Sequence, residues 1–472
     1  MKALETATVA AALARHFPGP VEVEDLRRLS GGASRETWSF DAVDADGARH
    51  ELVVRRDPGE WAGQTPRATE FELLRAAAAG GVAVPTTRFL LEPDDQMGSG
   101  FVMDRIAGET IPRRILRDDE YATARARLAA QCGEQAARIH ALPVAALPAL
   151  PVLGAAEQIE QYRQVLDSLG EPHPAFELGL RWLAEHAPVP VEPRLVHGDF
   201  RNGNLIVGPE GLRSVLDWEL AHLGDPVEDL GWCCVRSWRF GIVDHPVGGF
   251  GDVADMLAAY VAAGGEPVDP DRLAYWETFG TLKWGAICGI QAFAHLSGAV
   301  RSVELATLGR RIAETEWDLL RLIAGIPESE TEPPPSSQQD RAPLEDRPTL
   351  QDRPSAAELL EAVREFLERD VATATEGRTA FHARVAVNAL AIVERELVLG
   401  PSVDAPVITR LARLLDRSGT PTELVVDLAA RIRDGSLDDR RDELGGQVGD
   451  AVVDTVRDLV RAKLAVANPR YR

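Results

Sequence analysis

Lysine and cysteine are scarce in this sequence, and their scarcity excludes several kinds of site. Of the 51 basic residues, only Lys2, Lys283 and Lys463 are lysines, and all the others are arginines. The four cysteines have no C-x-x-C spacing, which argues against a zinc site and against a disulfide framework. The net charge of −23 argues against a nucleic-acid or membrane-surface partner, because such partners require a basic face.

Long hydrophobic runs are absent as well. No segment approaches the ~20 apolar residues needed to span a bilayer, and residues 1–17 lack the apolar run and cleavage site of a secretion signal. We therefore expect a cytoplasmic protein. The length of 472 residues predicts two or three domains, because one hydrophobic core rarely grows beyond ~250–300 residues.

Apolar residues nearly disappear at 327–355, where proline, serine, glutamine and charged residues take their place. Such a segment buries too little surface to offset its ordering entropy, so we predict a flexible, disordered linker. Before it, the patterning predicts an N-terminal helix, a small antiparallel sheet with one further helix, and a mainly helical part from about residue 118 onward. The predicted strands are 23–29, 36–43, 49–56, 88–92 and 100–104, the helices are 3–16 and 66–79, and a later β-rich stretch is 194–217.

Beyond the linker, apolar stripes at helical spacing predict an all-α module of about five helices. Gly400-Pro401 and Gly419 to Pro421 are predicted to separate some of these helices. The predicted fold class is therefore α+β, with a two-lobe first part and a separate all-α last part. The predicted domains are residues 1–105, residues 106–326, the linker at 327–355 and residues 356–472.

The densest polar cluster is the segment LVHGDFRNGNLIV, closely followed by SVLDWE. Two apolar strand-like segments bracket a loop that holds His197, Asp199 and Asn204, and a third such segment ends at Asp217. Phosphoryl transfer explains this arrangement, because it needs a carboxylate that deprotonates an alcohol and oxygen ligands that hold magnesium. A polar loop with two capping aspartates is the alternative.

These residues resemble the aminoglycoside-phosphotransferase and choline-kinase superfamily, the small-molecule branch of the protein-kinase-like fold. The resemblance implies a kinase whose two lobes are the first two predicted domains and which uses ATP and Mg²⁺. It also implies that Asp199 is the catalytic base, that Asn204 and Asp217 bind Mg²⁺, and that His197 braces the loop. Asp229, in the segment DPVEDLG, is implied to support the catalytic loop from a helix start, where an ordinary N-cap is an equally good interpretation.

Upstream, the segment LSGGASRETWSF predicts a strand, a glycine-bearing turn and a second strand. In the resemblance, backbone N–H groups of this turn approach the nucleotide phosphates, whereas many similar hairpins bind no ligand. The residues concerned are Ser30, Gly31, Gly32 and Ser34.

A kinase-like small lobe also needs a cation on its third strand. Because no lysine lies between residues 3 and 282, Arg55 in the segment VVRRDP is the candidate that binds the phosphates, and Arg56 is its rival. The helix glutamate that pairs with this cation would be Glu70, or else Glu72. A solvated charged helix face is the alternative for both glutamates.

The stretch GFVMDRIAG resembles the connector between the two lobes of such a kinase. Backbone groups of Met103, Asp104 and Arg105 would then bind the adenine of the nucleotide. Simple core packing explains Met103 equally well.

Within the superfamily, the segments VVRRDP, HGDFRNGN and DWELAHLGDPVEDLGW are most similar to the kinase-like domains fused to some acyl-CoA dehydrogenases. This resemblance covers most of residues 20–325. It implies a hydroxyacyl-CoA as the small-molecule hydroxyl acceptor and an acyl-CoA dehydrogenase as a partner. The C-terminal part resembles a helical domain of uncharacterised function that is found beside this kinase branch.

The aromatic-rich stretch 272–300 is a candidate wall of the acceptor site, with Lys283 and Trp284 as candidate substrate contacts. Core packing is the alternative for Trp284, and a surface position is the alternative for Lys283. Arg201, two residues beyond Asp199, is a further candidate that could meet an anionic acceptor.

Two other functions are compatible with these residues. One is an antibiotic or sugar kinase, although an aminoglycoside site is expected to concentrate acidic residues and 272–300 contains only Glu277. The other is a pseudokinase scaffold whose helical module docks a dehydrogenase. The intact set of Asp199, Asn204 and Asp217 argues against the scaffold, and the arginine at position 55 leaves room for it.

Overall fold

The computed structural model describes residues 4–29, 36–57, 66–326, 356–438 and 448–471. The chain folds into two compact units, each built from two stretches of sequence. The first unit contains Met1–Ala155 and Pro188–Gly280, and the second contains Ala156–Ala187 and Thr281–Arg472. Among the described residues, no helix is both long enough and apolar enough to cross a membrane. The predicted linker at 327–355 lies outside the described residues.

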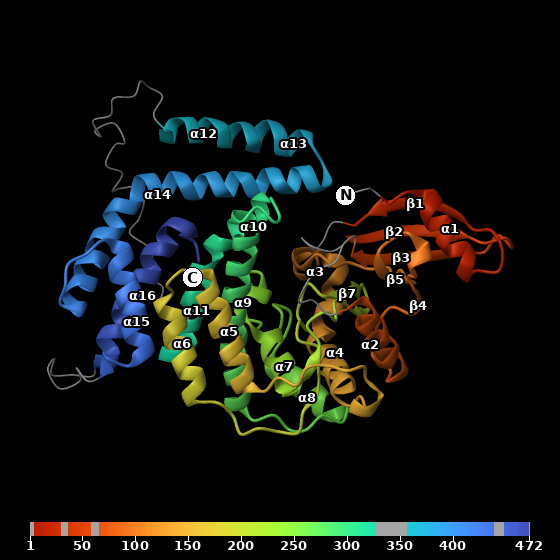
Figure 1. Cartoon of the computed structure of the whole chain (residues 1–472), viewed down its shortest axis with the longest axis horizontal. Helices are drawn as coiled ribbons and strands as arrows, with labels where there is room; N and C mark the ends of the chain where they lie inside the picture. The colour runs from red at the N-terminus through yellow and green to blue at the C-terminus, as the bar shows by residue number, and fades with distance from the viewer. Residues whose placement is uncertain (1–3, 30–35, 58–65, 327–355, 439–447, 472) are drawn as a thin grey trace. The chain divides into compact units, whose positions relative to one another are not determined.

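The first unit begins with a five-stranded antiparallel sheet in the order β1-β2-β3-β5-β4, which Figure 1 shows next to helix α1. Alternate residues of its strands form a core with α1 through Phe40, Leu52, Val54 and Val102, which are almost completely buried. The elements are α1 (Thr6–His16), β1 (Glu22–Arg28), β2 (Glu36–Val43), β3 (Arg49–Asp57), β4 (Thr87–Leu90) and β5 (Ser99–Asp104).

The opposite face of this sheet carries polar side chains. Arg55 of β3 pairs in register with Thr37 of β2 and with Phe101 of β5, and residues that pair directly share one face of a sheet. Helix α2 (Arg67–Ala79) follows β3 and brings Glu70 to this face, where it pairs with Arg55.

The rest of the first unit is helical around two small sheets, in which β6 pairs with β9 and β7 pairs with β8. The predicted β-rich stretch is therefore present as three short strands, and β9 follows it. The elements are α3 (Pro112–Arg117), α4 (Ala122–His140), β6 (Arg194–Val196), β7 (Leu205–Gly208), β8 (Gly211–Val215), β9 (His222–Gly224), α7 (Val227–Cys234) and α8 (Val253–Ala262).

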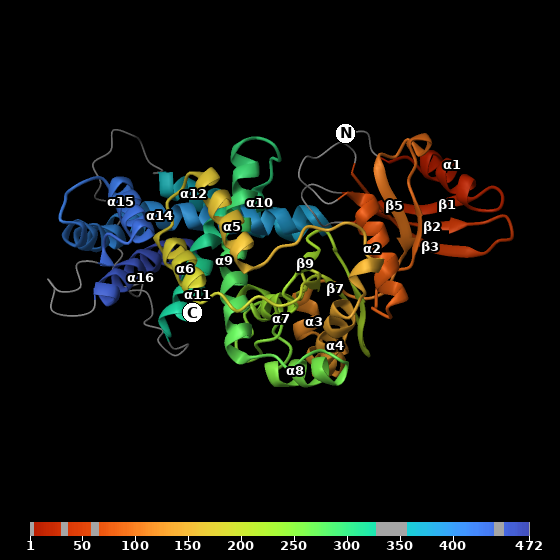
Figure 2. The same ribbon diagram turned by 60° about the horizontal axis from the view of Figure 1, so that its bottom comes forward.

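The second unit is all-α, and its helices α12 and α14 run side by side in Figures 1 and 2. Helix α9 (Pro270–Leu296) starts in the first unit and ends in the second. The other helices are α5 (Ala155–Leu169), α6 (Pro174–Glu185), α10 (Val303–Leu308), α11 (Ile312–Ala324), α12 (Ala356–Phe366), α13 (Ala372–Ala374), α14 (Gly377–Leu415), α15 (Pro421–Asp434) and α16 (Val448–Ala467). Short 3₁₀ turns lie at Pro93–Asp95, Asp119–Tyr121, Val144–Ala146, Arg236–Arg239 and Gly309–Arg311, and a π turn lies at Leu367–Val371.

The predicted helix break at Gly400-Pro401 is wrong. Helix α14 continues through both Pro401 and Pro406. Each proline removes one backbone N–H and would ordinarily kink or end a helix. The burial of Val407, Leu411 and Leu415 in a shared core explains why the helix continues, because that apolar stripe requires an unbroken helical path.

The C-terminal helices share one hydrophobic core with helices α6 and α11. Buried members of this core are Ala175, Ala313, Trp317 and Leu320 on one side, and Leu411, Leu428, Val456 and Val460 on the other. Packing thus divides the chain at positions other than the predicted boundaries at 105, 326 and 356. The four domains expected from the sequence therefore stay a prediction.

A buried ion pair ties helix α16 to helix α11 within this core. Lys463 Nζ lies 2.9 Å from both carboxylate oxygens of Glu316, which is completely buried and also binds His173 Nδ1 at 3.0 Å. Burial alone would raise the pKa of Glu316, but Lys463 and His173 lower it to about 2. The pair therefore contributes stability above pH 4.5 that is lost as the pH falls toward 2.

We predict that Lys463→Met lowers the free energy of unfolding by about 3 kcal/mol, because it leaves Glu316 as an unpaired buried carboxylate. This value is at the lower end of the range for such pairs, since a third of the Lys463 side chain is exposed. Urea denaturation of the whole chain at pH 7 measures it.

The double variant Glu316→Gln with Lys463→Met is the control. It removes the unpaired charge, so it should recover part of the lost stability. A double variant that is less stable than Lys463→Met would show that the charge of Glu316 is not the cause.

Candidate active site

The backbone of the polar loop is held by one buried carboxylate, that of Asp229 on helix α7. Its two oxygens accept the backbone N–H groups of His197 at 2.7 Å and Gly198 at 2.9 Å, and His140 Nε2 lies 3.1 Å away. Burial alone would raise the pKa of Asp229, but the hydrogen bond and charge of His140, with the backbone donors, lower it. The carboxylate therefore stays ionised at neutral pH, where it binds these donors most strongly.

Gly198 is required at its position by two independent constraints. Its φ of +80° lies in the left-handed region, and a Cβ added there would lie 2.3 Å from the backbone oxygen of Leu220. The loop can therefore pass close to the following segment only with glycine here.

His197 connects the polar loop to the residue before Asp217. Its ring Nδ1 accepts the backbone N–H of Asp199 at 3.1 Å, so the proton is on Nε2, which donates to the carbonyl oxygen of Leu216 at 3.1 Å. Complete burial lowers the pKa of His197, which keeps the ring neutral. The ring therefore joins the two loops by hydrogen bonds, which is the geometry of a positioning residue.

The Asp199 carboxylate lies at the centre of a hydrogen-bonded group. Its Oδ1 accepts from Arg201 Nε and from Trp232 Nε1, both at 2.8 Å, and its Oδ2 accepts from Asn204 Nδ2 at 2.5 Å. The side chain of Asp199 is 14% exposed, so a substrate can reach it. A carboxylate with accessible lone pairs is the group that a general base requires.

Asn204 and Asp217 come together through the backbone. The N–H of Leu216 donates to the carbonyl oxygen of Asn204 at 2.8 Å, which joins the two segments next to Asp217. Asp217 has a φ of 69°, an uncommon conformation outside glycine that is enriched in functional sites.

The pair Asn204 and Asp217 fits a magnesium ion. The amide nitrogen of Asn204 is engaged by Asp199, which leaves the amide oxygen as a ligand next to a carboxylate. The described residues contain no group of three or more His, Cys, Asp or Glu side chains that could hold a metal. Magnesium suits such a sparse site, because it commonly takes one or two carboxylates and completes its shell with water and phosphate oxygens.

Arg55 connects the sheet to this site. Its guanidinium pairs with Glu70 at 2.9 Å, with the carboxylate of Asp217, and with Glu219 at 3.5 Å. Burial alone would raise the pKa of Asp217, but the charge and hydrogen bond of Arg55 lower it. Arg56 points to the other face of β3, where it binds Glu36 at 2.7 Å.

The helix partner of Arg55 is Glu70 rather than Glu72. Glu70 is 1% exposed and also pairs with Arg67, which in turn binds Asp57 at 2.9 Å. Glu72 is exposed and lies 3.3 Å from Arg75 on the surface of the helix. The alternative of a solvated charged face therefore applies to Glu72 alone.

The lobe connector is part of the sheet. Met103 is 8% exposed and pairs with Val53, and the backbone N–H groups of Asp104 and Arg105 donate to Thr86 and Glu51 at 2.9 Å. These two N–H groups are therefore not free to bind the adenine of a nucleotide. The glycine-bearing turn with Ser30, Gly31, Gly32 and Ser34 lies outside the described residues.

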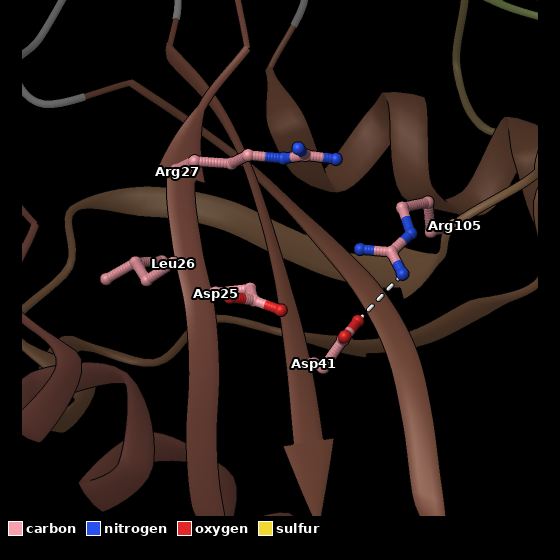
Figure 3. A pocket seen from close by; sticks show the side chains of 5 residues that line it. All are labelled: Asp25, Leu26, Arg27, Asp41 and Arg105. Carbon is pink, nitrogen blue, oxygen red and sulfur yellow. Dashed lines mark hydrogen bonds and ion pairs between the residues drawn. The ribbon is translucent and has the colours of Figure 1, made fainter.

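A cavity of about 410 Å³ lies on the sheet between β1, β2 and the end of β5. Figure 3 shows Arg105 paired with Asp41 across it, Arg27 extending toward Arg105, and Leu26 turned away. Asp41 pairs in register with Glu51, four residues before Arg55, so it shares the face of Arg55 at about 13 Å along the strand.

The acceptor candidates are distributed over both units. Lys283 and Trp284 belong to the second unit, whereas Asp199 belongs to the first. Lys283 is 3% exposed, so the alternative of a surface lysine is wrong. Arg201 binds Asp199 and lies over the ring of Trp238 at 4.2 Å. The substrate roles of these three residues stay predictions.

Sequence reasoning missed Glu219, Trp232 and His140. Glu219 lies two residues after Asp217. Its contact with Arg55 depends on how the five-stranded sheet packs against the segment that carries Asp217. Trp232 follows Asp229 by three residues on helix α7, so helical spacing could have placed both on one face. Nothing in the sequence indicates that His140 pairs with Asp229, because 89 residues separate them.

Comparison with known proteins identifies the class. Residues 25–276 match the model of the phosphotransferase enzyme family. Since this match covers more than half of the chain, the chain belongs to the phosphotransferase enzyme family. Residues 373–471 match a domain of unknown function, DUF6285.

The chain is also similar to two longer proteins. It is 31% identical over 243 residues to acyl-CoA dehydrogenase family member 10 of Mus musculus, covering 48% of this chain and 21% of the mouse protein. It is 24% identical over 368 residues to probable acyl-CoA dehydrogenase IBR3 of Arabidopsis thaliana, covering 69% of this chain and 43% of that protein. The chain thus spans less than half the length of these curated relatives.

A solved structure confirms the predicted fold class. A candidate aminoglycoside phosphotransferase from Ralstonia eutropha is 24% identical and superposes with a TM-score of 0.51. The match covers 67% of this chain and 98% of that protein. The likeness shows the fold, a mixed α+β arrangement to which this chain adds helices.

We predict that Asp229→Ala destabilises the protein by at least about 3 kcal/mol, because it leaves two buried backbone N–H groups and His140 without their acceptor. Urea denaturation measures the loss.

Asp44→Ala is the matched control. Asp44 also accepts two backbone N–H groups, of Asp46 at 3.0 Å and Ala48 at 2.9 Å, and also contacts a histidine, His50, but its side chain is 17% exposed. Water can replace these bonds, so we expect a clearly smaller loss of stability than for Asp229→Ala. Equal losses for the two variants would contradict the importance of burial at Asp229.

Proposed function

We propose that this phosphotransferase uses ATP and Mg²⁺ to phosphorylate a hydroxyl group of a small molecule. The observation that carries the proposal is the group formed by Asp199, Asn204, Asp217 and Arg55. Side-chain contacts join Asp199 to Asn204 and Asp217 to Arg55, and the backbone hydrogen bond from Leu216 to Asn204 links the two pairs. The group combines a base, a metal site and a phosphate-binding cation.

Each residue has a role that its contacts support. Asp199 takes the proton of the acceptor hydroxyl as the hydroxyl oxygen attacks the terminal phosphorus, and the bond from that phosphorus to the leaving ADP breaks. Arg55 binds phosphate oxygens with its planar fork while Glu70 holds it in place. His197 and Asp229 keep the loop in position.

Asn204 and Asp217 would hold Mg²⁺, which neutralises charge on the phosphates when it is bound. In the protein alone, Arg55 pairs with Asp217. Arg55 therefore exchanges a carboxylate for phosphate oxygens when the nucleotide binds. The carboxylates of Glu70, Asp217 and Glu219 surround Arg55, and the nucleotide is itself anionic, so a bound cation would favour the exchange by neutralising negative charge.

For the acceptor, we propose a hydroxyacyl-CoA. The similarity to proteins named as acyl-CoA dehydrogenases supports this choice, and the match covers only part of each of them. We also propose an acyl-CoA dehydrogenase as a partner, because the chain is similar to proteins that are named as acyl-CoA dehydrogenases.

We predict that the wild-type protein converts ATP to ADP in the presence of Mg²⁺ and a hydroxyacyl-CoA, and that Asp199→Ala reduces kcat by roughly 10²–10⁴-fold, the usual contribution of a general base. A coupled ADP assay across a panel of hydroxyacyl-CoA, sugar and aminoglycoside acceptors measures this.

The same panel separates the competing functions. Turnover of sugars or aminoglycosides alone would overturn the acyl-CoA acceptor. Absence of turnover on every acceptor, with no nucleotide-dependent rise in Tm, would overturn the kinase and favour a scaffold.

Arg55→Ala should weaken ATP binding roughly 10–100-fold, because it removes a charge-assisted contact to phosphate. Arg56→Ala is the neighbouring control: it breaks the buried pair with Glu36, so it should lower Tm and leave the dissociation constant of ATP nearly unchanged. Isothermal titration calorimetry below the Tm of both variants measures this, and equal weakening would contradict the role of Arg55.

A further inference from the structure

The two oxygens of the Asp199 carboxylate are in different surroundings. Oδ1 accepts two hydrogen bonds, from Trp232 Nε1 and from Arg201 Nε, each at 2.8 Å. Oδ2 accepts one, from Asn204 Nδ2 at 2.5 Å. A carboxylate offers about four lone-pair positions, two on each oxygen. Counting the donors among the described residues, both positions of Oδ1 are filled, and one position of Oδ2 remains for the acceptor hydroxyl.

The two donors to Oδ1 differ in how firmly they are held. Trp232 is 2% exposed and lies on helix α7, one turn after Asp229, which anchors the same loop. Arg201 has a side chain that is 22% exposed and lies over the ring of Trp238. Trp232 also contacts Trp238, with ring centroids 5.2 Å apart. The indole is thus the fixed donor, and Arg201 is the one that can move.

We propose that Trp232 is a positioning residue for phosphoryl transfer, which holds Oδ1 of Asp199 by its indole N–H so that Oδ2 faces the acceptor hydroxyl. This inference rests on the proposed function, because it assigns the geometry of that reaction. Helix α7 then acts on the reaction at two points, through Asp229 on the loop backbone and through Trp232 on the reactive carboxylate.

The proton transfer follows from this geometry. The acceptor hydroxyl donates to Oδ2, and its proton moves to Oδ2 as its oxygen forms a bond to the terminal phosphorus of the nucleotide. The bond between that phosphorus and the bridging oxygen breaks, and the electron pair leaves with the nucleoside diphosphate. Without the indole N–H, the carboxylate can rotate, so Oδ2 is less often aligned with the hydroxyl.

Two variants test the role of the indole N–H. Trp232→Phe removes the donor and part of the ring, and replacement of Trp232 by 3-benzothienylalanine removes the donor with almost the same shape. Both should lower kcat roughly 10–100-fold, the effect of losing one hydrogen bond to a charged group. The KM for the nucleotide should stay near that of wild type, because the indole N–H donates to the carboxylate of Asp199, whereas Arg55 is the residue proposed to bind the phosphates.

Trp38→Phe is the control. Trp38 lies on β2, and its Nε1 donates to the carboxylate of Glu36 at 3.1 Å. The variant loses an indole-to-carboxylate bond that does not reach Asp199, so its kcat should stay near that of wild type even if its Tm falls.

A second measurement does not depend on turnover. The protein has nine tryptophans, and ¹⁵N-labelled indole spectra can resolve their N–H signals. The Trp232 signal, assigned from the Trp232→Phe spectrum, should move upfield in Asp199→Ala because its acceptor is lost, while the Trp38 signal, assigned from the Trp38→Phe spectrum, should not move.

The outcomes separate this inference from the proposed function. An unchanged Trp232 signal in Asp199→Ala, or a wild-type kcat in the benzothienyl variant, would overturn the role of Trp232 and leave the phosphotransferase activity intact. Absence of turnover in the wild type would overturn the proposed function and, with it, the catalytic meaning of the bond. A shifted signal together with a lower kcat and an unchanged KM supports the inference.

Discussion

The buried carboxylate of Asp229 is the interaction on which the candidate active site depends. It lies on helix α7, holds the backbone of His197 and Gly198, and is kept ionised by His140. A charge that is completely removed from water is stable only when its hydrogen bonds are satisfied. The backbone donors that satisfy this charge belong to the loop that carries Asp199, so helix α7 holds that loop in position.

The second constraint is electrostatic. The protein is acidic, and Arg55 is the side chain that we propose binds the anionic phosphates. Arg55 is nearly surrounded by the carboxylates of Glu70, Asp217 and Glu219. An arginine never loses its proton here, and its flat guanidinium can contact several oxygens at once. The same property lets it bind carboxylates in the protein alone and phosphate oxygens in the proposed complex.

The C-terminal helices have a structural role that their sequence alone does not indicate. They bury a core with α6 and α11, and Lys463 supplies the charge that compensates Glu316. The region that matches a domain of unknown function is therefore packed as part of the second unit. Any change that removes it would expose Trp317 and Leu320 and leave Glu316 without its cation.

The sequence by itself determined the strands of the first sheet, the α+β class and the cluster of Asp199, Asn204 and Asp217, because periodicity and short spacing are local properties. It also restricted the strand cation to two arginines. Only the tertiary structure decided between Arg55 and Arg56, placed Glu70 rather than Glu72 beside the cation, and brought Trp232 onto Asp199. These contacts join residues up to 162 positions apart, so they depend on how sheet and helices pack and not on any local pattern.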